Sequence, residues 1–188
     1  MLAVSMGSAA CGGHKEKSGP APEVPDTTQR VVLLGRAGTD SLRVRLLADS
    51  TERTYTLRAA VAAKAVFGRL STGDTLAVVA APDGRDLRSV VNVGQIPGFW
   101  LFDGEDGNGM RLLPDGAAEN VGTAEVGLRS WRLKNGQLLI TYIPADGSRL
   151  QEQTDTSELR LLSDSVLSLT LRGRAYVCRR HSGLITAR

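Results

Sequence analysis

Apolar and polar residues alternate along most of the chain from Gln29 onward, which is the pattern of half-buried β-strands. Leucine and valine alternate with arginine over residues 42–46, and tyrosine and leucine alternate with threonine over residues 54–57. Gly73-Asp74 and Asp83-Gly84 supply turns between the runs. Further strands are expected at residues 33–35, 74–81 and 88–93.

One interruption of this alternation favours a helix. Residues 59–67 read AAVAAKAVF, and alanine is the strongest helix former. Five strands with one short helix predict a small five-stranded barrel of the oligonucleotide/oligosaccharide-binding (OB) type over residues 29–97.

The alternation restarts after Pro97, with short strands at the spacing of an all-β barrel or sandwich. Asn135-Gly136 lies between two such runs and is the strongest hairpin signal in the chain, because both residues tolerate a positive φ. We predict an eight-stranded antiparallel barrel over residues 98–180, followed by a flexible tail over 181–188. Its strands are expected around Trp100 and at residues 110–113, 117–121, 128–134, 138–143, 159–162, 166–171 and 175–178.

The N-terminus has a different pattern, with small and apolar residues leading to Cys11. Ser8-Ala9-Ala10-Cys11 resembles the lipobox of bacterial lipoproteins, although the stretch is short and lacks a basic start. We therefore interpret residues 1–10 as a truncated signal peptide and Cys11 as the acylated residue. Residues 11–28 have the composition of a flexible tether. Without an acidic residue after Cys11, an outer-membrane location is expected, with the membrane face left open.

Composition excludes several partners. The formal net charge is only +3, from 23 basic and 20 acidic residues, so nucleic acid is not an expected partner. Arg43, Arg45, Arg53 and Arg58 could line a basic face, but few aromatic residues are present for base stacking. No apolar run reaches the length of a membrane span. If Cys11 carries lipid, Cys178 has no partner for a disulfide within the chain.

Catalytic chemistry finds little support. The two histidines, His14 and His181, fall in the tether and the tail, so a histidine base is not expected in a core site. Residues 103–109 resemble a calcium loop, but no glutamate stands at the twelfth position. We expect no enzyme activity, no metal and no cofactor.

The second part of the chain carries a series of short motifs: Gly98-Phe99-Trp100, residues 112–117, Ser130-Trp131, residues 135–138, residues 164–169 and Tyr176-Val177-Cys178-Arg179. In their order and spacing these motifs resemble the lipocalin-like domains of secreted bacterial lipoproteins. The first part resembles the small β-domain that often precedes such a barrel, mainly through residues 70–76.

This resemblance implies roles for particular residues. Gly98 and Trp100 would form the signature of the closed barrel end, with Arg179 stacked on the indole. Trp131, Tyr142 and Tyr176 are candidates for lining a ligand cavity. The resemblance itself implies a fold rather than an activity. Our hypothesis is a non-enzymatic, lipid-anchored envelope protein that binds a small apolar molecule or an envelope partner. The alternative is a structural or assembly component whose barrel is filled and holds no ligand.

Overall fold

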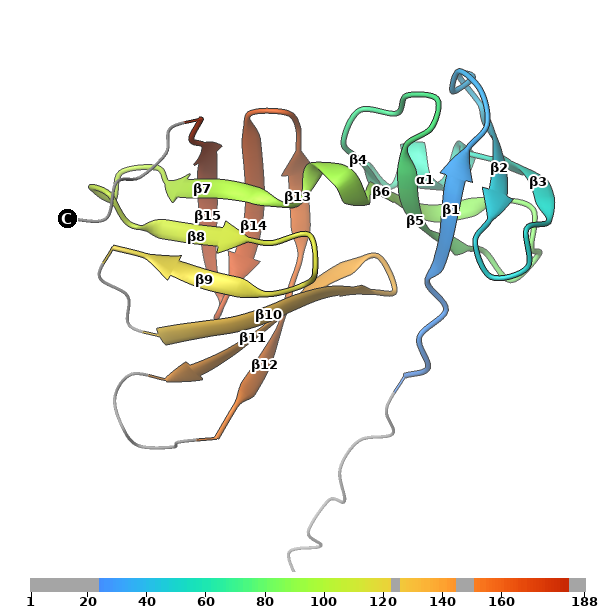
Figure 1. Ribbon diagram of the computed structural model, residues 1–188. Coiled ribbons are helices and arrows are strands. Elements are labelled where there is room, and N and C mark those ends of the chain that lie inside the picture. Colours follow the sequence, from blue (N-terminus) through green and yellow to red (C-terminus); the bar gives the residue numbers. More distant parts are fainter. Residues whose placement is uncertain (1–23, 123–125, 145–150, 183–188) are drawn as a thin grey trace, which may run out of the picture.

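The computed structural model describes residues 24–122, 126–144 and 151–182. Nearly all regular structure in these residues is β-strand (Figure 1). The first half, residues 29–97, contains β1 (Gln29–Leu33), β2 (Ser41–Leu46), β3 (Glu52–Thr56), α1 (Arg58–Ala62), β4 (Val66–Phe67), β5 (Thr75–Ala80), β6 (Leu87–Asn92) and η1 (Val93–Gln95). The second half, residues 98–180, contains β7 (Gly98–Phe102), β8 (Gly109–Leu112), β9 (Ala118–Val121), β10 (Val126–Lys134), β11 (Gln137–Pro144), β12 (Gln153–Ser157), β13 (Leu159–Leu162), β14 (Val166–Leu171) and β15 (Arg174–Arg180).

The first half is one sheet with the strand order β3-β2-β1-β5-β6-β4. A parallel bridge between Thr56 and Asp86 joins the end of β3 to the residue before β6, so the sheet curls back toward itself. Leu42, Val44 and Leu46 are buried, as their alternation with arginine requires. The sheet has one strand more than the five predicted. The additional strand, β4, has only two residues, too few to show an alternation of apolar and polar positions. The OB-type architecture stays a prediction.

The helix is shorter than the alanine-rich run suggests. It ends at Ala62, and Lys64 adopts a left-handed φ of 54°. Val66 and Phe67 then pair in parallel with Val90 and Val91 of β6. The prediction of a helix over residues 59–67 is therefore wrong in its second part, because pairing with the sheet outweighs helix propensity there.

The second half is an antiparallel meander divided between two sheets. The six-stranded sheet has the order β13-β14-β15-β7-β8-β9, and the three-stranded sheet has the order β10-β11-β12. The six-stranded sheet twists so strongly that β7 to β9 run across β13 to β15 (Figure 1). A bridge between Ala117 and Ser130 connects the two sheets on one side. The strands that the structure describes do not close into one continuous hydrogen-bonded ring.

Strand β12 is absent from the predicted set of eight. Its sequence, QTDTS, contains no large apolar residue, and only Ser157 is buried. Polar alternation of this kind gives no periodic hydrophobic signal. Glu158 alone separates β12 from β13, so this stretch leaves one sheet and enters the other without a loop.

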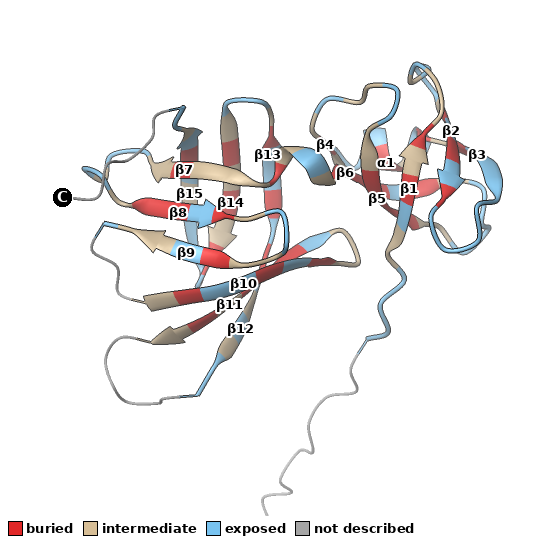
Figure 2. Ribbon diagram, in the orientation of Figure 1, coloured by how far each residue is buried: buried red, intermediate tan, exposed pale blue. Residues whose placement is uncertain are grey.

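The two halves share a hydrophobic core. Phe67, Ala77 and Val91 belong to the same buried cluster as Trp131 and Leu138 of the second half. Strands β5 and β6 are consequently buried on both faces (Figure 2). The predicted boundary after Pro97 follows the fully buried Ile96, so no exposed linker separates the halves at this point.

The end of the predicted tether is docked on the second half. Thr27 donates to Asn135 Oδ1 from its backbone N (2.8 Å) and from its hydroxyl (2.8 Å), and Asn135 Nδ2 donates to Pro25 O (2.9 Å). Asn135 and Gly136 have φ angles of 53° and 79°, as the predicted hairpin turn requires. The prediction of a flexible tether to residue 28 is therefore wrong for residues 25–28. The predicted signal peptide and Cys11 lie outside the described residues.

Candidate ligand-binding pocket

The end of the second half nearest the first half, called here the closed end, is built around Trp100. Its indole is fully buried, and its ring N–H donates to Ile96 O at 2.9 Å. The guanidinium carbon of Arg180 lies 4.2 Å from the ring centroid, which is a cation–π geometry. A Cβ on Gly98 would stand 2.1 Å from Arg180 Nη1, so only glycine leaves room for this arginine.

Arg180 also ties the closed end together through backbone carbonyls. Nε donates to Asp164 O (2.7 Å) and Nη1 to Pro97 O (2.8 Å), while Nη2 donates to Gln95 O. Burial lowers the pKa of Arg180, and the nearby Asp164 carboxylate opposes this shift. The guanidinium remains charged, because arginine does not deprotonate in proteins.

The expectation for Arg179 is wrong. Strand alternation places Arg179 on the outer face, where its Nη2 contacts Asp103 Oδ2 at 3.2 Å. Arg180 shares the inner face with the buried Cys178, and its Cα stands directly opposite Trp100 in the β15–β7 register. The arginine that stacks on Trp100 is therefore one residue further along the strand.

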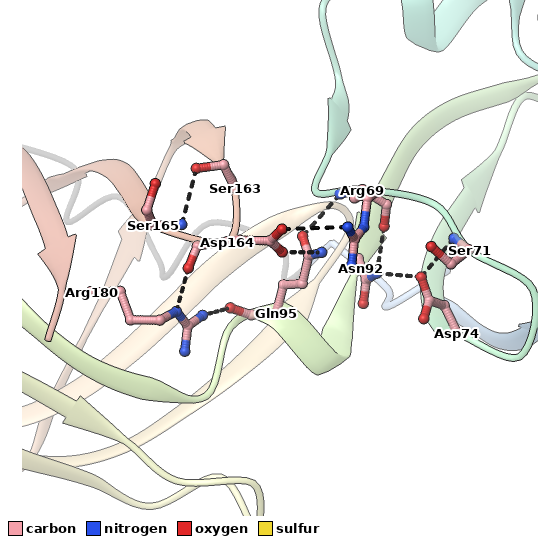
Figure 3. A network of polar contacts seen from close by, with 9 residues as sticks. All are labelled: Arg69, Ser71, Asp74, Asn92, Gln95, Ser163, Asp164, Ser165 and Arg180. Atoms are coloured by element: carbon pink, nitrogen blue, oxygen red, sulfur yellow. Dashed lines mark hydrogen bonds and ion pairs between the residues drawn. The ribbon is translucent and has the colours of Figure 1, made fainter. Parts of the chain in front are cut away.

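A polar network runs from the closed end into the first half (Figure 3). Asp164 accepts from Gln95 Nε2 at 3.0 Å and lies 3.7 Å from Arg69 Nη1. Arg69 O in turn accepts from Asn92 Nδ2 at 2.6 Å, and the same amide donates to Asp74 Oδ2 at 2.8 Å. The closed end is thus held by hydrogen bonds as well as by packing.

The opposite end, called here the pocket end, contains a cavity of about 210 Å³. Its lining comes from the ends of β7, β9 and β14 and the beginnings of β8, β10 and β15. Figure 1 shows the ends of β7 and β9 and the beginnings of β8 and β10 on the side away from the first half. The lining residues are Phe102, Glu105, Asn108, Gly109, Asn120, Val121, Val126, Leu128, Leu171, Arg172, Arg174 and Tyr176.

Aromatic and charged side chains meet in this cavity. The rings of Phe102 and Tyr176 pack with centroids 4.7 Å apart. Arg174 lies over the Tyr176 ring at 4.9 Å, and its Nη2 contacts Glu105 Oε1 at 2.9 Å. The pocket therefore combines an apolar wall with a few placed polar groups, which is the usual composition of a small-molecule site.

The three aromatic residues expected to line one cavity are separated. Tyr176 lines the pocket. Trp131 is buried in the shared core and donates to Leu113 O at 2.8 Å, so its expected lining role is wrong for this pocket. Tyr142 is buried in the same core cluster, with Arg172 5.6 Å from its ring centroid, and does not line the pocket either. Alternation alone does not distinguish an inward side chain that fills the core from one that borders a cavity.

Tyr176 is the one described lining residue that the sequence predicts; the others were missed, among them the aromatic and charged residues Phe102, Glu105, Arg172 and Arg174. One signal could have found the arginines. Leu171 pairs with Arg174 across a two-residue turn, Arg172-Gly173, with φ angles of 52° and 75°. Such a turn brings both arginines to one end of the sheet.

The described lining residues of the pocket offer binding groups, and the buried Cys178 adds no activated nucleophile. Cys178 is fully buried, and burial, with the nearby Glu105, raises the pKa of its thiol to about 12. A thiol that stays protonated is a poor nucleophile. Among the described residues no cluster of three histidine, cysteine or acidic side chains has the geometry of a metal site. No helix within the described ranges is long and apolar enough to cross a membrane.

Comparisons with known proteins bear on the second half. A family model described as Lipocalin-like matches residues 95–179. A solved structure of a lipocalin-like protein from Bacteroides thetaiotaomicron is 23% identical, covers 46% of this chain and 97% of its own chain, and aligns with a TM-score of 0.40. No curated protein matches the chain. The expected all-β, lipocalin-like fold class is confirmed.

Proposed function

We propose that this protein is a lipid-anchored binding protein of the bacterial cell envelope, which takes a small apolar molecule into the pocket end of its lipocalin-like half. The observation that carries the proposal is the cavity of about 210 Å³ between Phe102, Leu128, Leu171 and Tyr176. A lipocalin barrel is just wide enough to hold one small ligand. The first half then serves as the base that covers the other end.

The position of the docked residues 25–28 supports an orientation in which the pocket faces away from the membrane. Residues 25–28 are held by Asn135 at the tip of the β10–β11 hairpin. Val126, at the other end of β10, lines the pocket, and the nine residues of this strand span about 27 Å. If the chain is anchored through Cys11, the segment that leads to the membrane joins the folded part at this hairpin, far from the pocket. The mouth of the pocket would then stay accessible.

Native mass spectrometry tests the binding role. The full chain, purified from a bacterial envelope, should carry a non-covalent adduct that dissociates on activation. Val126→Phe would fill the pocket and remove the adduct. Val177→Phe makes the same change on an exposed outer position of β15 and serves as the matched control. Equal adducts on both variants would contradict a ligand in this pocket.

The anchor has a separate test. Cys11→Ser should move the protein from the membrane fraction to the soluble fraction, whereas Cys178→Ala should leave it in the membrane. Persistence of the Cys11→Ser variant in membranes would contradict anchoring through this residue.

One observation favours the alternative, a structural or assembly component. Trp100, Met110 and Ile140 are fully buried, Trp131 is nearly so, and the remaining cavity is smaller than the roughly 300 Å³ at which ligand pockets usually begin. A bare mass in native spectrometry, unchanged after addition of envelope extract, would support this alternative and direct the search to protein partners.

A further inference from the structure

We infer that a cleft between the two halves, separate from the pocket end, binds a small organic acid. The acid carries one carboxylate, a second hydrogen-bonding oxygen and a short branched apolar group. The lining residues of this interface cleft are Ala63, Lys64, Ala65, Phe67, Ser89, Asn135, Gly136, Gln137, Glu158, Leu159 and Arg160. None of these residues lines the pocket end, so the inference goes beyond the proposed function.

The interface cleft lies where the end strands of two sheets approach each other. Strand β4 ends the sheet of the first half, and β13 ends the six-stranded sheet of the second half. They meet where the Gly68 N–H donates to Leu162 O at 3.0 Å. The cleft has a volume of about 490 Å³. This volume falls within the range of small-molecule sites, roughly 300–1,000 Å³.

Apolar side chains form part of the lining. Phe67 is 8% exposed and Leu159 is 5% exposed, and both belong to the core that the two halves share. Ala63 and Ala65 line the cleft beside them and have the smallest apolar side chains, which leave room for a ligand. Because the core behind Phe67 and Leu159 is already filled, the apolar part of the ligand is short.

The helix α1 ends in a way that places a lysine at the rim of the cleft. The Lys64 N–H donates to Val61 O at 3.0 Å. The Ala65 N–H donates to Ala60 O at 2.7 Å, which completes a Schellman motif. Lys64 has a φ of 54° at the position where glycine is usual, because a side chain makes this conformation more costly. A lysine retained at a strained position beside a cleft points to a use for its side chain.

The charge of Lys64 is available for a ligand. The other two charged lining residues are paired with each other, since Arg160 Nη2 lies 3.7 Å from Glu158 Oε2. Lys64 makes no ion pair or side-chain hydrogen bond within the described ranges. The lining therefore carries one positive charge in excess, on an exposed ammonium group. A carboxylate is the complementary group, because it accepts charge-assisted hydrogen bonds from an ammonium.

A buried hydroxyl indicates the second oxygen of the ligand. Ser89 is 8% exposed, and its Oγ has no hydrogen-bond partner among the described residues. The Asn135-Gly136 turn packs closely on it, since a Cβ on Gly136 would stand 2.5 Å from Ser89 Oγ. A buried hydroxyl without a partner is costly, and Ser89 lines the cleft. A hydroxyl or carbonyl oxygen of the ligand would supply the missing hydrogen bond.

NMR titration of the ¹⁵N-labelled full chain with α-hydroxyisocaproate tests the inference. The backbone amides of Lys64, Ser89 and Gln137 should shift, whereas those of Leu128 and Tyr176 at the pocket end should not. The neutral amide of the same acid should bind about fivefold more weakly, because it lacks the charge. Isocaproate, which lacks the hydroxyl, should bind about threefold more weakly.

Variants of Lys64 assign the carboxylate. Lys64→Gln should weaken α-hydroxyisocaproate by about fivefold and change its neutral amide by less than twofold, while Lys64→Arg should retain most of the binding. Lys64→Gly should weaken binding equally and yet raise the melting temperature, because glycine relieves the left-handed φ. Ser50→Gly is the matched control. Ser50 has a φ of 60° on the exposed β2–β3 turn, so this variant should also be more stable but should bind like the wild type.

A variant of Ser89 assigns the second oxygen. Ser89→Ala should weaken α-hydroxyisocaproate by about threefold, to the affinity of isocaproate, and should leave isocaproate unchanged. It should not lower the melting temperature, because it removes a hydroxyl that has no partner in the fold. A lower melting temperature with unchanged binding would overturn the role of Ser89 in the site.

The outcomes separate this inference from the proposed function. Equal binding of the acid and its amide, or unchanged binding in Lys64→Gln, would overturn the carboxylate class. Tighter binding of trileucine than of the free acid would overturn the small acid and indicate the C-terminus of a peptide. Shifts confined to the pocket end would overturn the interface site and support the pocket. If no probe causes shifts, this inference is overturned, and the adduct on the wild-type chain still tests the proposed function.

Discussion

The two ends of the lipocalin-like half use the same pair of residue types, an aromatic ring and an arginine, for different purposes. At the closed end, Arg180 lies 4.2 Å from the fully buried Trp100 and donates to three backbone carbonyls. At the pocket end, Arg174 lies 4.9 Å from the partly buried Tyr176, and two thirds of its side chain remain exposed. An arginine whose donors bind the backbone stabilises the fold, whereas an arginine with exposed donors is suited to a ligand.

Truncation of the two rings should give the largest contrast. Trp100→Ala should lower the free energy of unfolding by about 3–5 kcal/mol, because it leaves a large cavity in the core. Tyr176→Ala should cost about 1 kcal/mol, since the side chain borders a space that already exists. Urea unfolding followed by circular dichroism measures both. Similar losses would show that the pocket end is packed as tightly as the closed end.

The two adjacent arginines offer the next contrast. Arg180→Gln should lower stability by about 2 kcal/mol, as the carbonyls of Gln95, Pro97 and Asp164 lose a charged donor. Arg179→Gln should have no measurable effect, because its contact with Asp103 is on the surface. A larger loss from Arg179→Gln than from Arg180→Gln would contradict the assignment of the stacked residue.

A smaller effect should come from the glycine beside that arginine. Gly98→Ala should cost about 1–2 kcal/mol in the wild type, where the new Cβ would meet Arg180 Nη1. In an Arg180→Ala background the same change should cost clearly less, since the clashing atom is gone. Additive losses in this double-mutant cycle would mean that Gly98 is required for another reason.

The last contrast appears only at high pH and concerns the buried thiol of Cys178, between the two ends. Its pKa is raised to about 12 in the folded protein, above the ordinary value of 9.0, so the unfolded state loses its proton first. This contribution to stability is fully present below pH 9 and is lost as the pH rises toward 12, at up to about 1.4 kcal/mol per pH unit. Cys178→Ala should remove this part of the pH dependence. Identical curves for the two proteins between pH 9 and 11 would argue against the raised pKa.

The sequence predicts the fold better than it predicts the site. Strands such as β2, β10 and β14 are readable because one face is apolar and the other polar. Strand β12 is not readable, because it is held by pairing with β11 and carries only small polar residues. Residues 25–28 look like a tether because nothing in their composition reveals Asn135, more than 100 residues away.

The pocket shows a sharper limit of sequence reasoning. Choosing Arg179 over Arg180 is an error of one residue, and in a strand one residue changes the face. Choosing Trp131 and Tyr142 over Phe102 and Arg174 has a different cause. Large aromatic side chains fill space when other elements cover them, and here the first half covers the β10–β11 hairpin with Phe67 and Val91.

The contact between residues 25–28 and Asn135 also sets an order of events during protein synthesis. The hairpin that carries Asn135 is translated long after the first strand, so this contact cannot form while the first half emerges from the ribosome. The apolar surface of β5 and β6 likewise stays uncovered until Trp131 and Leu138 have been translated and can pack on it. Contacts of such long sequence separation form slowly. A nascent chain interrupted near Pro97 would therefore expose this apolar surface to solvent, and we expect chaperones to bind it until the second half is complete.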